Sequence, residues 1–145
     1  MLFPSLNRSD AEKVFISCRN ISGATVSAGI PVEWDVVTAT DGNAVTAAKS
    51  GSLSGLFAGV TDASMTDSAY GLVQVYGFRT SAYVSAASAG NVPGQLLVPA
   101  AGIFTDATMS AATTSGHVWV SLMETVAAAA GSSATAQYNV FIRAL

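Results

Sequence analysis

Residues 14–19, with the sequence VFISCR, decide the fold class. Val14, Ile16 and Cys18 alternate with the side chains between them, and this period of two is the pattern of a strand with one buried face. Residues 32–37, VEWDVV, alternate in the same way. The sequence therefore predicts β-structure at both places.

Strand patterns recur through the rest of the chain, and glycine-rich turns separate them. Asp41-Gly42 is typical of a hairpin turn, because both residues tolerate a positive φ. Strands at intervals of about 8–12 residues are typical of a β-sandwich or small barrel. The further predicted strands are Leu56–Thr61, Tyr70–Arg79, Ala82–Ala86, Gln95–Val98, Val118–Val126 and Ala136–Ile142, the last with Tyr138, Val140 and Ile142 facing inward. We therefore predict an all-β fold, a small β-sandwich or barrel-like domain with long Gly/Ala/Ser loops.

The remaining segments lack a clear period. Two short patterns, Ser9–Val14 and Val126–Ala130, favour helix, although strand pairing can override both. The tracts 38–55 and 106–116 are rich in Ala, Ser, Thr and Gly and are predicted as surface loops. The domain organisation that we expect is an N-terminal arm at residues 1–11 followed by one β-rich domain at residues 12–145.

The expected arm holds the candidate interface residues. Leu2, Phe3, Pro4 and Leu6 lie outside any periodic element. Exposed Leu and Phe side chains can fill a pocket on a neighbouring protein, or the backbone can extend the edge of a sheet. The alternative is a frayed terminus or a segment folded back on its own core.

The composition favours a protein that is covered by neighbours. Only 10% of the residues are charged and half are hydrophobic, whereas about 25% of an average globular domain is charged. The net charge of −3 with six scattered Lys and Arg argues against nucleic-acid binding, because a phosphate backbone requires clustered cations. No apolar run approaches the ~20 residues of a membrane span, and the first residues do not resemble a signal peptide.

The sequence offers little catalytic chemistry. His117 is the only histidine and Cys18 the only cysteine, which excludes a structural zinc site within one chain. No nucleophile elbow surrounds a serine. Glu33 and Asp35 are expected on one strand face, where a solvated or partner-binding pair is commoner than an acid–base pair. We therefore expect no enzymatic activity, no catalytic residue, no metal and no cofactor.

A recurring pattern of glycine and valine runs through residues 20–105, and it resembles the capsid cement, or head decoration, proteins of tailed bacteriophages. Its segments are Gly23–Val32, Phe57–Val60, Gly71–Gly77 and Ala89–Leu96. The resemblance implies a structural protein made in the host cytoplasm that binds the outer surface of the virion capsid. It also implies the major capsid protein as partner and a homo-oligomer, with trimers as the first expectation by family analogy.

Two other functions remain open. A tail, baseplate or fibre component would also be β-rich and charge-poor, but fibres usually show repeats or heptads, and neither pattern is found in the sequence. A carbohydrate-binding β module is the other alternative, because aromatic side chains can stack on sugars. The candidates for stacking are Trp34, Tyr70, Tyr76, Tyr83 and Trp119.

Overall fold

The computed structural model describes residues 12–39, 41–47, 56–85, 90–106, 120–126 and 135–144. These residues form nine strands and no helix, which confirms the all-β prediction. The strands are β1 (Lys13–Asn20), β2 (Pro31–Trp34), β3 (Ala44–Ala47), β4 (Phe57–Thr61), β5 (Tyr70–Ser85), β6 (Leu96–Ala100), β7 (Ile103–Asp106), β8 (Val120–Leu122) and β9 (Thr135–Arg143).

The nine strands form a single sheet that closes on itself twice. Its order is β1-β3-β2-β4-β5-β7-β6-β8-β9, with two additional pairings, β1–β5 and β5–β9. The first additional pairing closes a ring of β1, β3, β2, β4 and β5, and the second closes a ring of β5, β7, β6, β8 and β9. We call these rings the N-terminal and C-terminal barrels. Closure leaves neither ring with an open strand edge.

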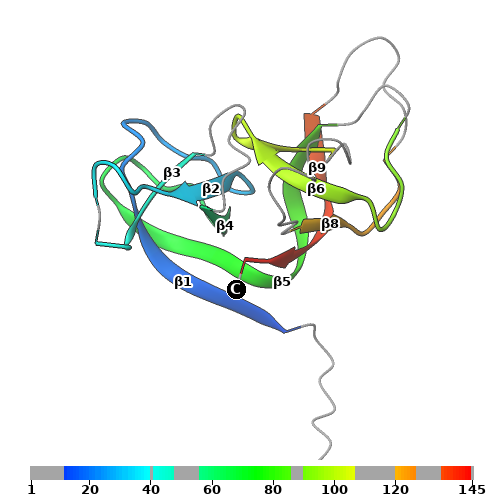
Figure 1. Ribbon diagram of the computed structural model, residues 1–145, viewed down its shortest axis with the longest axis horizontal. Helices are drawn as coiled ribbons and strands as arrows, with labels where there is room; N and C mark the ends of the chain where they lie inside the picture. The colour runs from blue at the N-terminus through cyan, green and yellow to red at the C-terminus, as the bar shows by residue number, and fades with distance from the viewer. Residues whose placement is uncertain are drawn as a thin grey trace, which may run out of the picture.

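The 16-residue strand β5 belongs to both barrels. Its first half pairs with β1 and β4, and its second half pairs with β9 and β7. Figure 1 shows β5 in green running through both lobes, with β1–β4 on one side and β6, β8 and β9 on the other. The sequence predicts two strands in this region, Tyr70–Arg79 and Ala82–Ala86. The structure merges them, with a register shift between Arg79 and Ala82.

The two barrels repeat one topology. In each ring only the pairing of the first strand with the third is parallel, namely β1–β3 and β5–β7, and every other pairing is antiparallel. Each barrel also has one isolated antiparallel bridge at the same place in its topology, Val26 with Met65 and Asn91 with Val126. The described chain is therefore a structural tandem repeat, although its sequence contains no recognisable repeat.

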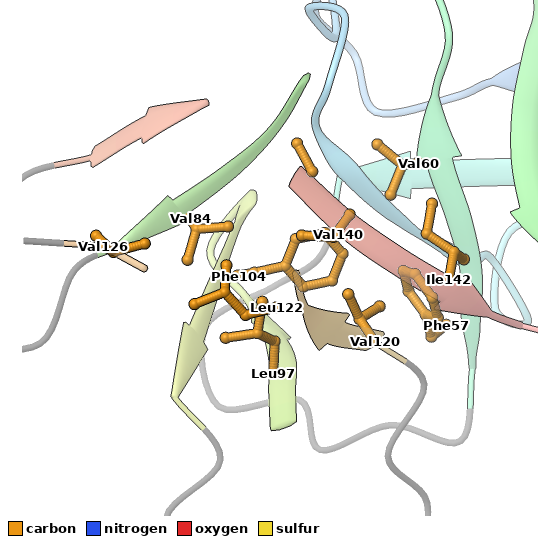
Figure 2. Close-up of a cluster of buried hydrophobic side chains, with 11 residues drawn as sticks. Phe57, Val60, Val84, Leu97, Phe104, Val120, Leu122, Val126, Val140 and Ile142 are labelled. Atoms are coloured by element: carbon orange, nitrogen blue, oxygen red, sulfur yellow. The ribbon is translucent and has the colours of Figure 1, made fainter. Parts of the chain in front are cut away.

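Two hydrophobic cores fill the two barrels. The core of the C-terminal barrel contains Phe57, Val60, Ala82, Val84, Leu97, Phe104, Val120, Leu122, Val126, Val140 and Ile142, most of which Figure 2 labels. The core of the N-terminal barrel contains Cys18, Val26, Val32, Val45, Ala58, Met65, Val73 and Val75. β4 contributes to both, because Phe57 and Val60 join one core while Ala58 joins the other. The barrels therefore share β4 as a packed wall as well as sharing β5.

The predicted alternation holds in β1 and β9. The side chains of Ile16 and Cys18 pack in the N-terminal core, and Val140 and Ile142 are fully buried in the C-terminal core. Tyr138 is partly buried against the latter core, as predicted. Strict alternation across a half-buried sheet explains why these positions are readable from sequence.

Several segment predictions were wrong or reach beyond the described residues. The predicted loop 38–55 contains β3, because Ala44 and Val45 are buried against their strand neighbours. Asp106, predicted to begin a loop, is the last residue of β7. Within the predicted helix Ser9–Val14, residues 13 and 14 are strand, and Val126 forms a β-bridge rather than starting a helix. The other residues of both helix predictions lie outside the described residues, apart from residue 12, which precedes β1.

Candidate interaction surfaces

The predicted interface residues are not among those that the structure describes. Leu2, Phe3, Pro4 and Leu6 all precede residue 12, where the described chain begins, and the arm stays a prediction. His117 also lies outside the described ranges. The candidate surfaces described below are formed by other side chains of the two barrels.

The Cys18 side chain lies in the core of the N-terminal barrel and is 1% exposed. Burial removes the thiolate from water and raises the pKa of the Cys18 thiol to about 11. The nucleophilic form of cysteine is the thiolate, so this group is protonated at neutral pH. The geometry agrees with the interpretation of Cys18 as an inert core residue.

Glu33 and Asp35 do not form the carboxylate pair that the sequence predicted on one strand face. β2 ends at Trp34, so Asp35 lies beyond the strand, and Glu33 within it is buried. Asp35 Oδ1 accepts hydrogen bonds from the backbone amides of residues 37, 38 and 39, at 3.0, 2.6 and 3.1 Å. Asp35 thereby fixes the loop that follows β2, which is a turn-forming role.

The most extensive polar contacts surround Arg79 at the junction of the barrels. Arg79 Nη2 donates to the carbonyl oxygen of Thr61 at 2.8 Å, and Nη1 lies 3.3 Å from Asp62 Oδ1 and 3.4 Å from Gln74 Oε1. Burial lowers the pKa of Arg79, while the Asp62 carboxylate opposes that shift. The Arg79 guanidinium links the end of β4 to the register shift of β5, which is a structural role. Among the described residues, no group of three or more His, Cys, Asp or Glu side chains could hold a metal ion.

An exposed surface covers the outer side of β1 and the start of β5, and we call it the basic–aromatic face. Its register is fixed by the pairs Ser17 with Leu72 and Arg19 with Tyr70, since directly paired residues of neighbouring strands share a face. Tyr70 is 63% exposed and Leu72 is 50% exposed. The basic–aromatic face consists of Lys13, Phe15, Ser17, Arg19, Tyr70 and Leu72, all of which are exposed.

A second apolar surface lies on the C-terminal barrel, and we call it the C-terminal apolar patch. It consists of Val92, Leu96 and Met123, which are all exposed. Leu96 pairs with Ser121 of β8, and Met123 follows Ser121 by two residues. The turn before β6 brings Val92 close, because the Gln95 amide donates to the Val92 carbonyl oxygen at 3.1 Å.

A third exposed feature is the loop after β2, which we call the acidic loop and define by Asp35, Val36, Val37 and Asp41. The side chain of Val37 is 87% exposed and that of Val36 is 52% exposed. Asp41 Oδ1 accepts a hydrogen bond from the Asn43 amide at 3.1 Å, the turn chemistry expected at this position. A pocket of about 310 Å³ lies beside the loop and is lined by Trp34, Asp35, Val36, Gly42 and Leu56.

The aromatic residues proposed for sugar stacking occupy separate places. Trp34 lines the pocket beside the acidic loop, whereas Tyr70 belongs to the basic–aromatic face. Tyr76 packs edge-on against Phe141, with ring centroids 5.4 Å apart. Tyr83 is half-buried near the other end of β5, and Trp119 lies outside the described residues. A multi-aromatic binding platform does not arise from the described members of this set.

The alternation in the sequence predicted that Phe15 and Arg19 lie on the outer side of their strand. It did not show that Tyr70 and Leu72 of β5 join them, and it did not reveal the C-terminal apolar patch. The missing signal is the strand register, which joins residues distant in sequence.

No known family model and no curated protein matches this chain. The described residues also contain no helix long and apolar enough to cross a membrane.

Proposed function

We propose that this protein is a structural capsid decoration protein that binds the outer surface of a phage head and stabilises its lattice. The observation that carries the proposal is that each barrel exposes a cluster of large apolar side chains. Phe15, Tyr70 and Leu72 lie on the N-terminal barrel, and the C-terminal apolar patch lies on the other. The resemblance of the glycine-and-valine pattern to cement proteins supports the same function.

A cement protein has to hold two kinds of neighbour at once, a capsid subunit and another copy of itself, and two separate contact surfaces suit that task. Contiguous apolar clusters on a soluble protein commonly mark interaction sites. The rigid sheet joins the two clusters through β5. Many identical copies on a lattice then act together, so that individually weak contacts give strong overall binding. The partner in this proposal is the major capsid protein.

The test is co-sedimentation of the purified protein with expanded phage heads that lack it. Met123→Glu places a charge in the centre of the C-terminal apolar patch, and it should reduce occupancy of the heads by about tenfold or more. Ser64→Glu adds the same charge at an exposed position outside both clusters and serves as the control. Loss of binding in both variants, or in neither, would argue against a role for the patch, and failure of the wild type to bind would remove the proposal.

The N-terminal arm is a separate prediction of the same function. Deleting residues 2–8 removes Leu2, Phe3, Pro4 and Leu6 and leaves the described β-structure intact. Reduced occupancy of expanded heads by this folded variant is the expected result. Unchanged occupancy would discard the arm while leaving the decoration function standing.

Small-ligand binding is the second candidate, and one observation favours it. The pocket beside the acidic loop has an aromatic wall at Trp34 and a carboxylate at Asp35, a combination found in sites that hold amphipathic ligands such as sugars. A glycan array would reveal it, and Trp34→Ala should then abolish the signal. A protein that binds neither heads nor glycans would move the assignment to a tail or fibre component.

A further inference from the structure

The basic–aromatic face has a charge that sets it apart from the rest of the molecule. The chain carries a net charge of −3, yet both charged residues of this face, Lys13 and Arg19, are cations. The outward positions of β1 and the exposed start of β5 carry no carboxylate, and the nearest one along the chain, Glu12, precedes the strand. Aromatic and arginine side chains are also the residues most enriched at protein interfaces.

The acidic loop has the complementary chemistry on the same chain. Val36 and Val37 project as an exposed apolar pair, and the carboxylates Asp35 and Asp41 lie on either side of them in sequence. Hydrogen bonds from the backbone amides of residues 37, 38 and 39 to Asp35 order the first part of the loop. A preordered loop loses little conformational entropy when it binds.

The acidic loop lies at the Arg19 end of the basic–aromatic face. β3 runs parallel to β1 there, and the Arg19 amide donates to the Asn43 carbonyl oxygen at 2.9 Å. Asp41 is two residues from Asn43, so the acidic loop leaves the sheet beside the Arg19 end of the face. Two copies placed side by side can therefore each present a loop and a face to the other.

We propose that the basic–aromatic face binds the acidic loop of a second copy of this chain. Phe15, Tyr70 and Leu72 supply apolar contact for Val36 and Val37 of the other copy. Arg19 and Lys13 then lie against the carboxylates of that loop, which is electrostatic complementarity of the kind that fixes orientation. Stacking of two such faces directly on each other would instead oppose cation with cation. Because each copy both gives and receives the contact, two copies can pair reciprocally about a twofold axis or repeat the contact head to tail.

This contact is independent of the capsid, and its test needs only the purified full chain. Analytical ultracentrifugation from about 1 to 100 µM covers the range in which a micromolar contact forms. The wild type should self-associate, and added salt should weaken the association because the contact includes charged pairs. Arg19→Glu and Asp41→Arg should each weaken self-association by about tenfold.

Charge exchange makes the test specific. Mixing Arg19→Glu with Asp41→Arg should restore association between the two variants, because each contact of a mixed pair again joins opposite charges. Arg143→Glu is the control, since it reverses an exposed cation on β9 outside the face. Circular dichroism confirms that each variant is folded.

Four results would overturn the proposal. A wild type that stays monomeric at every concentration has no such contact. An oligomer that is indifferent to both charge reversals, or one that mixing does not restore, uses another surface. A monomer whose binding to phage heads is lost with Arg19→Glu would assign the face to the capsid instead. Head binding without self-association, or self-association without head binding, separates this proposal from the decoration function.

Discussion

Gly29 and Gly94 occupy the same position in the two barrels. Each has a positive φ, 81° and 84° respectively, in the turn that leads into the second strand of its barrel. Their amides donate to equivalent carbonyl oxygens at the ends of β4 and β8, those of Thr61 at 2.9 Å and Leu122 at 2.8 Å. The left-handed conformation strains any residue with a Cβ atom. One element of the repeat thus depends on glycine in both copies.

Substituting these glycines by alanine should destabilise the protein to different extents. Gly94→Ala should cost about 1–2 kcal/mol through the positive φ alone, since an added Cβ atom meets nothing within 4 Å. Gly29→Ala should cost roughly 3–4 kcal/mol, because the new Cβ also overlaps the backbone oxygen of Ser81 on β5. Urea unfolding measures the free energy of unfolding of both variants. Equal losses would contradict the added cost that we assign to the overlap with Ser81.

Removing Arg79 should weaken the junction of the barrels. Arg79 is 5% exposed and holds the Thr61 carbonyl oxygen, so Arg79→Ala leaves buried acceptors without their donor and should cost about 3 kcal/mol. The Asp62 side chain is 46% exposed, and Asp62→Asn should cost only about 0.5 kcal/mol. Thermal or urea unfolding checks this difference, and similar losses for the two variants would show that the ion pair rather than the carbonyl contact holds the junction.

The Cys18 thiol should make stability fall at alkaline pH. Its pKa in the native protein is raised to about 11, whereas the unfolded chain ionises at about 8.5. The unfolded state therefore loses its proton first, so the stabilisation is complete below about pH 8.5 and decreases as the pH rises towards 11. Over that window the wild type should lose roughly 1–3 kcal/mol more than Cys18→Ala. Parallel pH profiles of the two proteins would contradict a buried neutral thiol.

The barrels should unfold as one unit because they share β4 and β5. Phe104 is fully buried in the C-terminal core and contacts the Phe57 ring of β4, with centroids 5.8 Å apart. Phe104→Ala should cost about 3–5 kcal/mol. Hydrogen exchange should then accelerate at the protected amides of β2 and β3 as well, although both strands belong to the other barrel. Acceleration confined to β6–β9 would show that the barrels unfold separately.

Local alternation explains which strands could be predicted. β1 and β9 each bury one face over eight or nine residues, so the apolar side chains mark the inward positions. β3 and β7 have only four residues each, and Ala44 of β3 carries no strand signal despite its burial. Small residues in a narrow barrel are selected by space rather than by hydrophobic period.

The double closure and the repeat depend on information that is not local. The pairing of β5 with β9 joins residues 50 or more positions apart, such as Val84 with Ala136, and the strand register determines which residues pair. Equivalent positions also hold different residues: Val45 pairs with Asn20 in one barrel, and Phe104 pairs with Val84 in the other. The repeat therefore conserves hydrogen bonding and burial, and it leaves no repeated motif in the sequence.

The candidate surfaces also include parts that can be predicted from a single strand and parts that depend on strand pairing. The outward positions of β1, including Phe15 and Arg19, follow from alternation within one strand. Tyr70 and Leu72 join them only through the antiparallel register of β1 and β5. The C-terminal apolar patch needs the pairing of β6 with β8, which links Leu96 to Ser121. Surfaces assembled across strands are thus visible only once the sheet is known.

The measurement that tests the proposed function most directly is a cryo-electron reconstruction of expanded phage heads incubated with the purified protein. The decoration function predicts regular density at symmetric sites on the outer surface, with both barrels visible in each copy and Leu96 and Met123 facing a capsid subunit. Bare heads in the presence of folded protein would contradict the function and return the assignment to a tail component or a ligand-binding module.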